Sequence, residues 1–102
     1  MDRNGYEPSI IPWHSPTKCW LCDCNGRGKM DRHEVFGGAY REKSKRLGLW
    51  VHLCHEDCHL RRMHQTGGSE AKLLKFEAQR CAMEKYGWTK EDFIREFGKR
   101  YL

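Results

Sequence analysis

The sequence predicts a small α+β domain that is stapled by zinc, with a β-β-α core and two helices after it. Three observations support this fold class. Four cysteines occur as two closely spaced pairs, which is typical of a structural zinc site. Two short segments rich in strand-forming residues lie between these pairs. The C-terminal part of the chain has apolar residues at helical spacing.

The length of 102 residues is typical of a single domain. A domain of this size buries a modest core and gains stability from a bound metal. No apolar run approaches the roughly 18 residues of a membrane span, and the first residues lack the apolar stretch of a secretory signal. We therefore expect a cytoplasmic protein without a membrane partner. In a reducing cytosol, paired cysteines favour metal binding over disulfides.

The N-terminal part differs in composition from the rest of the chain. Residues 1–17 hold all three prolines and show no periodicity, which predicts an irregular arm. Residues 18–102 are then expected to form one zinc-bound domain. This domain opens with the first cysteine pair and a glycine-rich turn.

A β-β-α core is expected over residues 29–64. Residues 30–36 alternate as a half-buried strand does, and residues 49–53 are rich in β-forming side chains. The polar residues 40–47 between these strands predict either a loop or a short helical turn. A short helix over residues 55–64 completes the predicted core.

Two further helices are expected over residues 69–98. Ser69 is a suitable N-cap for the first helix, and Gly87 ends it. Thr89 opens the second helix with a motif close to a capping box, and Gly98 closes that helix.

The paired cysteines are the predicted ligands of a structural Zn²⁺ ion. Thiolates two or three residues apart can converge tetrahedrally on one ion at about 2.3 Å. Two alternatives stay open, because Cys24 could replace Cys22, and His55 could replace one of the later cysteines. Cys81 lies on the apolar face of a helix and is interpreted as a small buried hydrophobe. The predicted zinc ligands are Cys19, Cys22, Cys54 and Cys58.

Histidine and carboxylate residues near the cysteines predict a second metal site. His33 and Glu34 lie at the end of the first strand, and His59 and His64 lie on or just past the short helix. A divalent ion needs nitrogen and oxygen ligands from such converging elements, with one position open to water and substrate. Either strand residue could instead act as a general base toward water. Two other histidines are expected to pack rather than bind metal: His14 and His52.

The formal net charge of +5 permits a polyanionic partner such as DNA. Basic residues gather in the segment between the two strands and beside the second cysteine pair. A solvated surface explains such runs equally well, but their position next to metal-type residues favours phosphate contact. The candidate nucleic-acid-binding residues are Arg41, Lys43, Lys45, Arg46, Arg61 and Arg62.

The ordered combination of these motifs resembles the HNH (ββα-metal) endonucleases, and most closely the small phage proteins related to the recombination-enhancement nuclease Ref. The resemblance covers about residues 18–102. The cysteine pairs alone are not specific, whereas their order with the strand motifs is. The motifs are Cys-x-x-Cys, His-Glu-Val-Phe-Gly-Gly at residues 33–38, Gly-Leu-Trp-Val-His-Leu-Cys at 48–54, the pair Cys58 and His59, His64, and Phe-Gly-Lys-Arg-Tyr-Leu at 97–102.

The resemblance implies a hairpin and a helix that hold one divalent ion (Mg²⁺, Mn²⁺ or Zn²⁺) at the scissile phosphate. The family usually has His-His or Asp-His on the first strand, a metal ligand followed by a base. By alignment, His33 is then the ligand and Glu34 the base, whereas by chemistry their roles are exchanged. His59 and His64 fall in the helical ligand region, and His59 is also expected in catalysis. Ser44 or a polar neighbour stands where the family has a middle asparagine.

Two functions are therefore predicted. The first is a metal-dependent DNA endonuclease encoded by a phage or mobile element, and acting in the host cytosol. A homodimer, or recombination proteins of host or phage, are expected as further partners of this enzyme. The alternative is a noncatalytic zinc-binding module that binds DNA or a protein.

Overall fold

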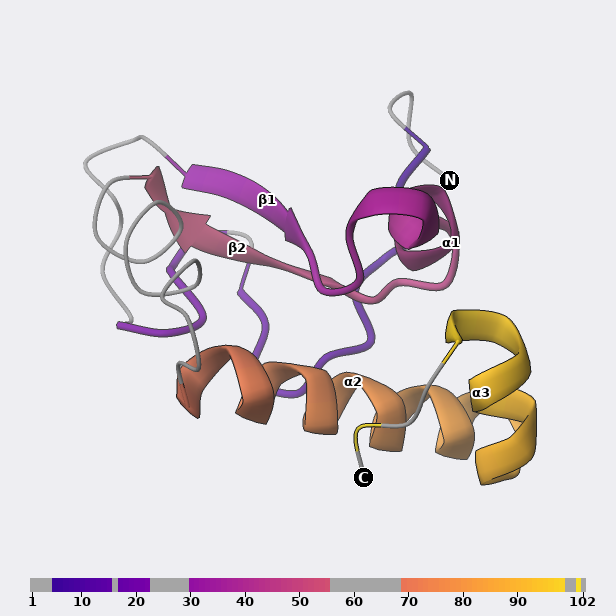
Figure 1. The fold of residues 1–102 in the computed structure, drawn as a ribbon. Helices are drawn as coiled ribbons and strands as arrows, with labels where there is room; N and C mark the ends of the chain where they lie inside the picture. Colours follow the sequence, from indigo (N-terminus) through magenta and orange to yellow (C-terminus); the bar gives the residue numbers. More distant parts are fainter. Residues whose placement is uncertain (1–4, 16, 23–29, 56–68, 99–100, 102) are drawn as a thin grey trace.

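The described part of the chain has an α+β architecture, as predicted, and contains a two-stranded sheet and three α-helices (Figure 1). A computed structural model describes residues 5–15, 17–22, 30–55, 69–98 and 101. The elements are β1 (Met30–Glu34), the 3₁₀ turn η2 (Gly38–Tyr40), α1 (Arg41–Arg46), β2 (Trp50–Cys54), α2 (Ser69–Tyr86) and α3 (Lys90–Phe97). Across these residues, no helix has both the length and the apolar character to cross a membrane. The helix expected at 55–64 falls, apart from His55, outside the described residues.

The two strands form an antiparallel hairpin with two chemically distinct faces. The register runs from Met30 opposite Cys54 to Glu34 opposite Trp50. Side chains alternate along a strand, and directly paired residues share a face. One face, here called the arm face, carries Met30, Arg32, Glu34, Trp50, His52 and Cys54. The opposite face, here called the core face, carries Asp31, His33, Val51 and Leu53.

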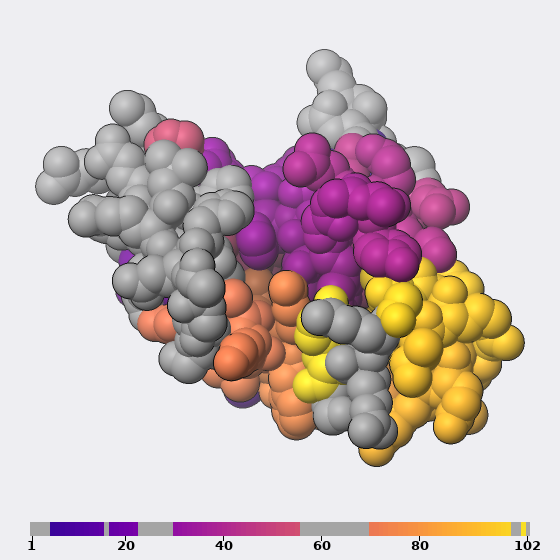
Figure 2. All heavy atoms as spheres, viewed as in Figure 1, coloured from indigo at the N-terminus to yellow at the C-terminus, as the bar shows by residue number. Residues whose placement is uncertain are grey.

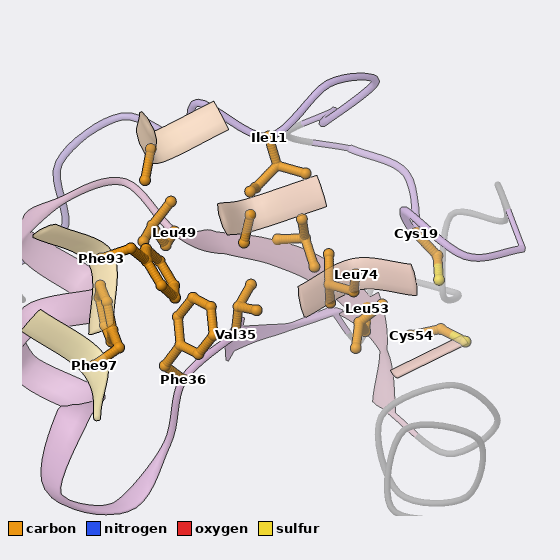
Figure 3. Close-up of a cluster of buried hydrophobic side chains, with 13 residues drawn as sticks. Ile11, Cys19, Val35, Phe36, Leu49, Leu53, Cys54, Leu74, Phe93 and Phe97 are labelled. Carbon is orange, nitrogen blue, oxygen red and sulfur yellow. The ribbon is translucent and has the colours of Figure 1, made fainter. Parts of the chain in front are cut away.

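The hydrophobic core lies beneath the hairpin, where α2 and α3 pack (Figure 1). Val51 and Leu53 on the core face are fully buried, as are Ala78 of α2 and Phe93 of α3. Burial of such side chains contributes roughly 1.5–3 kcal/mol each for the larger ones. Figure 3 shows the labelled core side chains extending from α3 to the cysteines. Cys19 and Cys54 therefore belong to the same buried cluster as the apolar side chains. The labelled residues are Ile11, Cys19, Val35, Phe36, Leu49, Leu53, Cys54, Leu74, Phe93 and Phe97.

The N-terminal arm covers the free edge of β2. Two groups of the arm and one of the cysteine segment after it donate to carbonyls of β2 and the residues before it. The Ile10 amide donates to Gly48 at 2.9 Å, the Ser9 hydroxyl to Trp50 at 2.6 Å, and the Trp20 amide, just after the arm, to His52 at 2.8 Å. These carbonyls recur at every second residue, which is the spacing of an outward-facing strand edge. The arm is irregular, as predicted, but it completes the hairpin by satisfying an edge that would otherwise be open.

The polar segment between the strands forms a short helical turn, one of the two predicted alternatives. Ser44 of α1 is fully buried, and its hydroxyl donates to the Leu49 carbonyl at 2.5 Å and accepts from the Phe36 amide at 3.3 Å. Both ends of the connection are therefore tied to one side chain. Ser44 has a structural role here, which differs from its expected place as a polar residue of the site.

The last helix, α3, has the predicted caps, whereas Ser69, predicted as the N-cap of the preceding helix, is the first residue of α2. The Thr89 hydroxyl accepts from the Asp92 amide, and the Asp92 carboxylate accepts from the Thr89 amide, which makes a complete capping box. Gly98 ends α3 in the left-handed conformation. Cys81 is buried on α2, as predicted. Figure 2 shows α1 and α3 meeting at the surface, where the Lys43 ammonium donates to the Glu96 carbonyl at 2.9 Å.

Candidate metal centre

Three of the four predicted zinc ligands converge at one end of the hairpin. The sulfurs of Cys19, Cys22 and Cys54 all lie within 4.8 Å of one another. The Cys22 and Cys54 sulfurs are 3.8 Å apart, which is too long for a disulfide. Zn–S bonds of about 2.3 Å at a tetrahedral angle separate two sulfurs by about 3.8 Å. The cluster can therefore hold a metal ion such as zinc.

The cluster forms because the arm and β2 end side by side. Cys54 is the last residue of β2 and points to the arm face, while the hydrogen bond from the Trp20 amide to His52 fixes the Cys19 turn beside it. The amides of Leu21 and Cys22 point at the Cys19 sulfur, at 3.4 and 3.5 Å. Amide donors favour the negatively charged thiolate, which is the form that binds a metal.

The fourth zinc ligand is not among the clustered residues. Cys58, and Cys24 as the alternative to Cys22, both lie outside the described residues. His55 turns away from the sulfurs, because it follows Cys54 and therefore points to the core face. Its Nδ1 lies 2.6 Å from the Asp31 carboxylate. The prediction that His55 could replace a cysteine is not supported by this geometry.

His33 and Glu34 point to opposite faces of β1. His33 is half-buried on the core face, opposite Val51, whereas Glu34 lies on the arm face opposite Trp50. The Tyr6 hydroxyl donates to the Glu34 carboxylate at 2.7 Å. Burial, and next the bond to Glu34, raise the pKa of Tyr6 well above its ordinary value. The two residues expected to share ligand and base roles thus have different surroundings.

The other predicted members of the histidine site, His59 and His64, lie outside the described residues, as do Arg61 and Arg62. The carboxylate that shares the core face with His33 is Asp31, two residues earlier on the same strand. It also contacts His55, the first residue after β2. Asp31 is not among the site residues predicted from the sequence. The spacing of Asp31 and His33 on a predicted strand nevertheless already places both residues on one face.

His14 and His52 pack against each other, as expected. Their rings are stacked with centroids 5.1 Å apart, and His14 Nε2 lies 3.0 Å from His52 Nδ1. Both rings also contact Trp50. Burial lowers the pKa of both histidines, so the neutral forms are favoured. The pair is a packing element between the arm and β2.

Two of the four described candidate phosphate-binding residues already have acidic or aromatic partners. The Lys43 ammonium lies 3.4 Å from the Glu96 carboxylate, and the Lys45 ammonium lies 3.6 Å from Glu42 and 4.8 Å from the Tyr6 ring centroid. A lysine held in this way loses part of its attraction for a phosphate. The other two candidates, Arg41 and Arg46, are exposed on α1.

The described residues form a small α+β domain with a cluster of three cysteines that could hold a metal ion such as zinc. No family model, curated protein or solved structure matches the chain. Its function is therefore argued from the residues and their geometry.

Proposed function

We propose that the protein is a metal-dependent endonuclease of the HNH type, which hydrolyses phosphodiester bonds of DNA and carries a structural zinc ion. The observation that carries this proposal is the hairpin itself. Its second strand ends in the sulfur cluster at Cys54, and its first strand carries His33 on the opposite face. The ordered motifs of residues 18–102 that resemble HNH endonucleases support the same function.

The proposed chemistry uses the core face of the hairpin. A divalent ion bound there would stabilise the negative charge on the phosphate and on the leaving oxygen. His33 is half-buried, and an imidazole has a pKa close to neutrality, so it is suited to accept a proton from the attacking water. Arg41 and Arg46 are exposed on α1 and are the described candidates that we assign to contact with the DNA backbone.

Nicking of supercoiled plasmid DNA tests the enzyme directly. The zinc-loaded protein is incubated with plasmid and Mg²⁺, Mn²⁺ or Zn²⁺, alongside His33→Ala and His14→Ala. We expect metal-dependent nicking by the wild-type protein and by His14→Ala, and a loss of at least 100-fold in His33→Ala. Equal zinc content and circular dichroism confirm that the variants are folded. A wild-type protein that does not nick, or a His33→Ala protein that nicks normally, contradicts the proposal.

A noncatalytic zinc module that binds DNA is the second candidate. It is favoured by the fact that, among the described residues, the sulfur cluster is the one group of three or more side chains with metal-binding geometry. In that case the basic side chains alone would carry binding, and affinity would fall steeply with salt. Metal counting separates the two functions: a single zinc per chain, with salt-dependent DNA binding and no nicking, supports the module.

A further inference from the structure

We propose that His55, oriented by Asp31, is a ligand of the divalent ion on the core face of the hairpin, and that Glu34 is not. This inference rests on the proposed nuclease function for the role of the ion. The binding site itself is defined by Asp31 of β1 and by His55, the residue that follows β2. It adds a ligand that the cysteine and histidine spacing did not indicate.

The Asp31–His55 contact has the geometry of a metal-supporting pair. The carboxylate oxygen and His55 Nδ1 are 2.6 Å apart, which is short for a hydrogen bond between nitrogen and oxygen. In a neutral imidazole, an acceptor at Nδ1 places the proton on that nitrogen and leaves the Nε2 lone pair available. Metal-binding histidines commonly donate their second ring nitrogen to a carboxylate in this way. The Asp31 contact therefore prepares His55 Nε2 for an ion.

The strand register brings the same pair to the face of His33. Asp31 is opposite Leu53 and His33 is opposite Val51, so both point to the core face. His55 continues the alternation of β2 and points the same way, whereas Cys54 points to the sulfur cluster. The soft sulfur of Cys54 and the harder imidazole of His55 thus point in opposite directions from neighbouring residues. This arrangement suits two different ions.

Solvent can reach the proposed site. The side chains of Asp31 and His55 are 30% and 45% exposed, so an ion that still carries water molecules can approach them. A catalytic ion needs such an open position, whereas a structural ion is enclosed by protein ligands. In the sulfur cluster, Cys19 and Cys54 are buried and Cys22 is exposed. Two of the three sulfurs are therefore more enclosed than Asp31 and His55, which suits a structural ion in the sulfur cluster and an exchangeable ion at the Asp31–His55 pair.

Glu34 is committed to the arm face. Its carboxylate accepts the Tyr6 hydroxyl at 2.7 Å, and the Arg32 guanidinium lies 4.4 Å from the centroid of the same Tyr6 ring. A ligand at position 34 would have to leave this cluster and pass to the other side of β1. The carboxylate that can support an ion on the core face is therefore Asp31, through its contact with His55.

Manganese binding to the zinc-loaded protein tests the inference. Free Mn²⁺ is followed by electron paramagnetic resonance during titration of the wild type, Asp31→Asn, His55→Ala and the matched control Glu34→Gln. We expect a 10- to 100-fold weaker Mn²⁺ affinity in Asp31→Asn. We expect at least the same loss in His55→Ala, and a change within about twofold in Glu34→Gln. Asp31→Asn preserves shape, so it keeps the test valid if His55→Ala fails to fold.

Three results would overturn the inference: a wild-type protein that binds no Mn²⁺, unchanged affinity in both core-face variants, or a loss in Glu34→Gln equal to that in His55→Ala. Plasmid nicking by the same proteins separates this inference from the proposed function. Mn²⁺ binding that depends on Asp31 and His55, without nicking, supports the ligand assignment and contradicts the nuclease. Nicking that is unaffected by both substitutions supports the nuclease and contradicts the ligand assignment.

Discussion

The two faces of the β1–β2 hairpin use similar residue types for different purposes. On the arm face, His14 contacts His52 and Trp50. Glu34 accepts a hydrogen bond from Tyr6 on the same face. On the core face, a carboxylate and an imidazole meet where solvent can reach them. The difference teaches that a histidine or glutamate near a cysteine pair gains its role from the face it occupies, not from its distance along the chain.

Loss of one sulfur ligand is the change expected to affect this comparison most. Cys54→Ala should lose bound zinc and most of its folded signal, because metal-binding energy in small sites is also folding energy, on the order of 10 kcal/mol. Zinc content and circular dichroism measure both effects. Cys81→Ala is the control, since Cys81 is buried on α2 away from the cluster and should keep one zinc. A Cys54→Ala protein with wild-type melting would show that the arm face is stable without metal.

Adding a methyl group at Gly48 tests how closely the arm must approach β2. Gly48 has φ of +75°, and a Cβ there would lie 2.4 Å from the Pro8 carbonyl oxygen. We expect Gly48→Ala to lower the free energy of unfolding by about 2 kcal/mol or more, from left-handed strain and the clash together. Urea denaturation measures the change. Gly37→Ala is the matched control, because a Cβ at Gly37 meets no atom within 4 Å. Equal changes in the free energy of unfolding for both variants would mean that the arm can shift away from Gly48 at little cost.

Removing the Tyr6 hydroxyl tests the arm-face cluster around Glu34. We expect Tyr6→Phe to lower the free energy of unfolding by about 1 kcal/mol at neutral pH, through loss of the bond to Glu34. The folded-state pKa of Tyr6 is raised above its ordinary value near 10, chiefly by burial. The stabilisation by the hydroxyl is therefore complete below pH 10 and is lost as the pH rises above that value. Unfolding measured from pH 7 to 11 should show the two proteins converging; a constant difference would refute this account.

The smallest predicted effect concerns the exposed part of the arm. Trp13 has φ of 63° and is 82% exposed, so a bulky side chain occupies the left-handed region with little burial in return. We expect Trp13→Asn to stabilise the protein by up to about 1 kcal/mol, because asparagine tolerates this conformation better. Thermal unfolding should show a melting temperature that is a few degrees higher. A lower melting temperature would mean that the Trp13 ring makes contacts that matter to the arm.

The sequence predicted the elements well because their signals are local. Alternation located the first strand, β-forming side chains located the second, and the capping residues Thr89 and Gly98 located α3. Three cysteines of the predicted zinc site also converge as expected. Each of these predictions depends on residues that are close in sequence, or on a strong geometric demand of the metal itself.

The surroundings of the individual side chains could not be predicted in the same way. His33 and Glu34 are adjacent in sequence, and adjacency suggested a shared site, although strand geometry places them on opposite faces. The contact between Asp31 and His55 depends on the register of the hairpin, which the helical turn between the strands sets through Ser44. The role of the arm required knowledge of which edge of β2 is open. Register and edges arise from tertiary contacts, which a single sequence does not display.

The chain separation of the arm contacts has a consequence for the order of folding. The hairpin closes over the short segment from Glu34 to Trp50, whereas the Ser9 bond to Trp50 spans 41 residues and the Cys22 contact with Cys54 spans 32. The entropy lost on loop closure grows with the length of the loop, and non-local contacts slow folding. The hairpin should therefore form first, and the arm should close on it later. Metal capture by the three sulfurs would then be a late step that locks a preformed sheet.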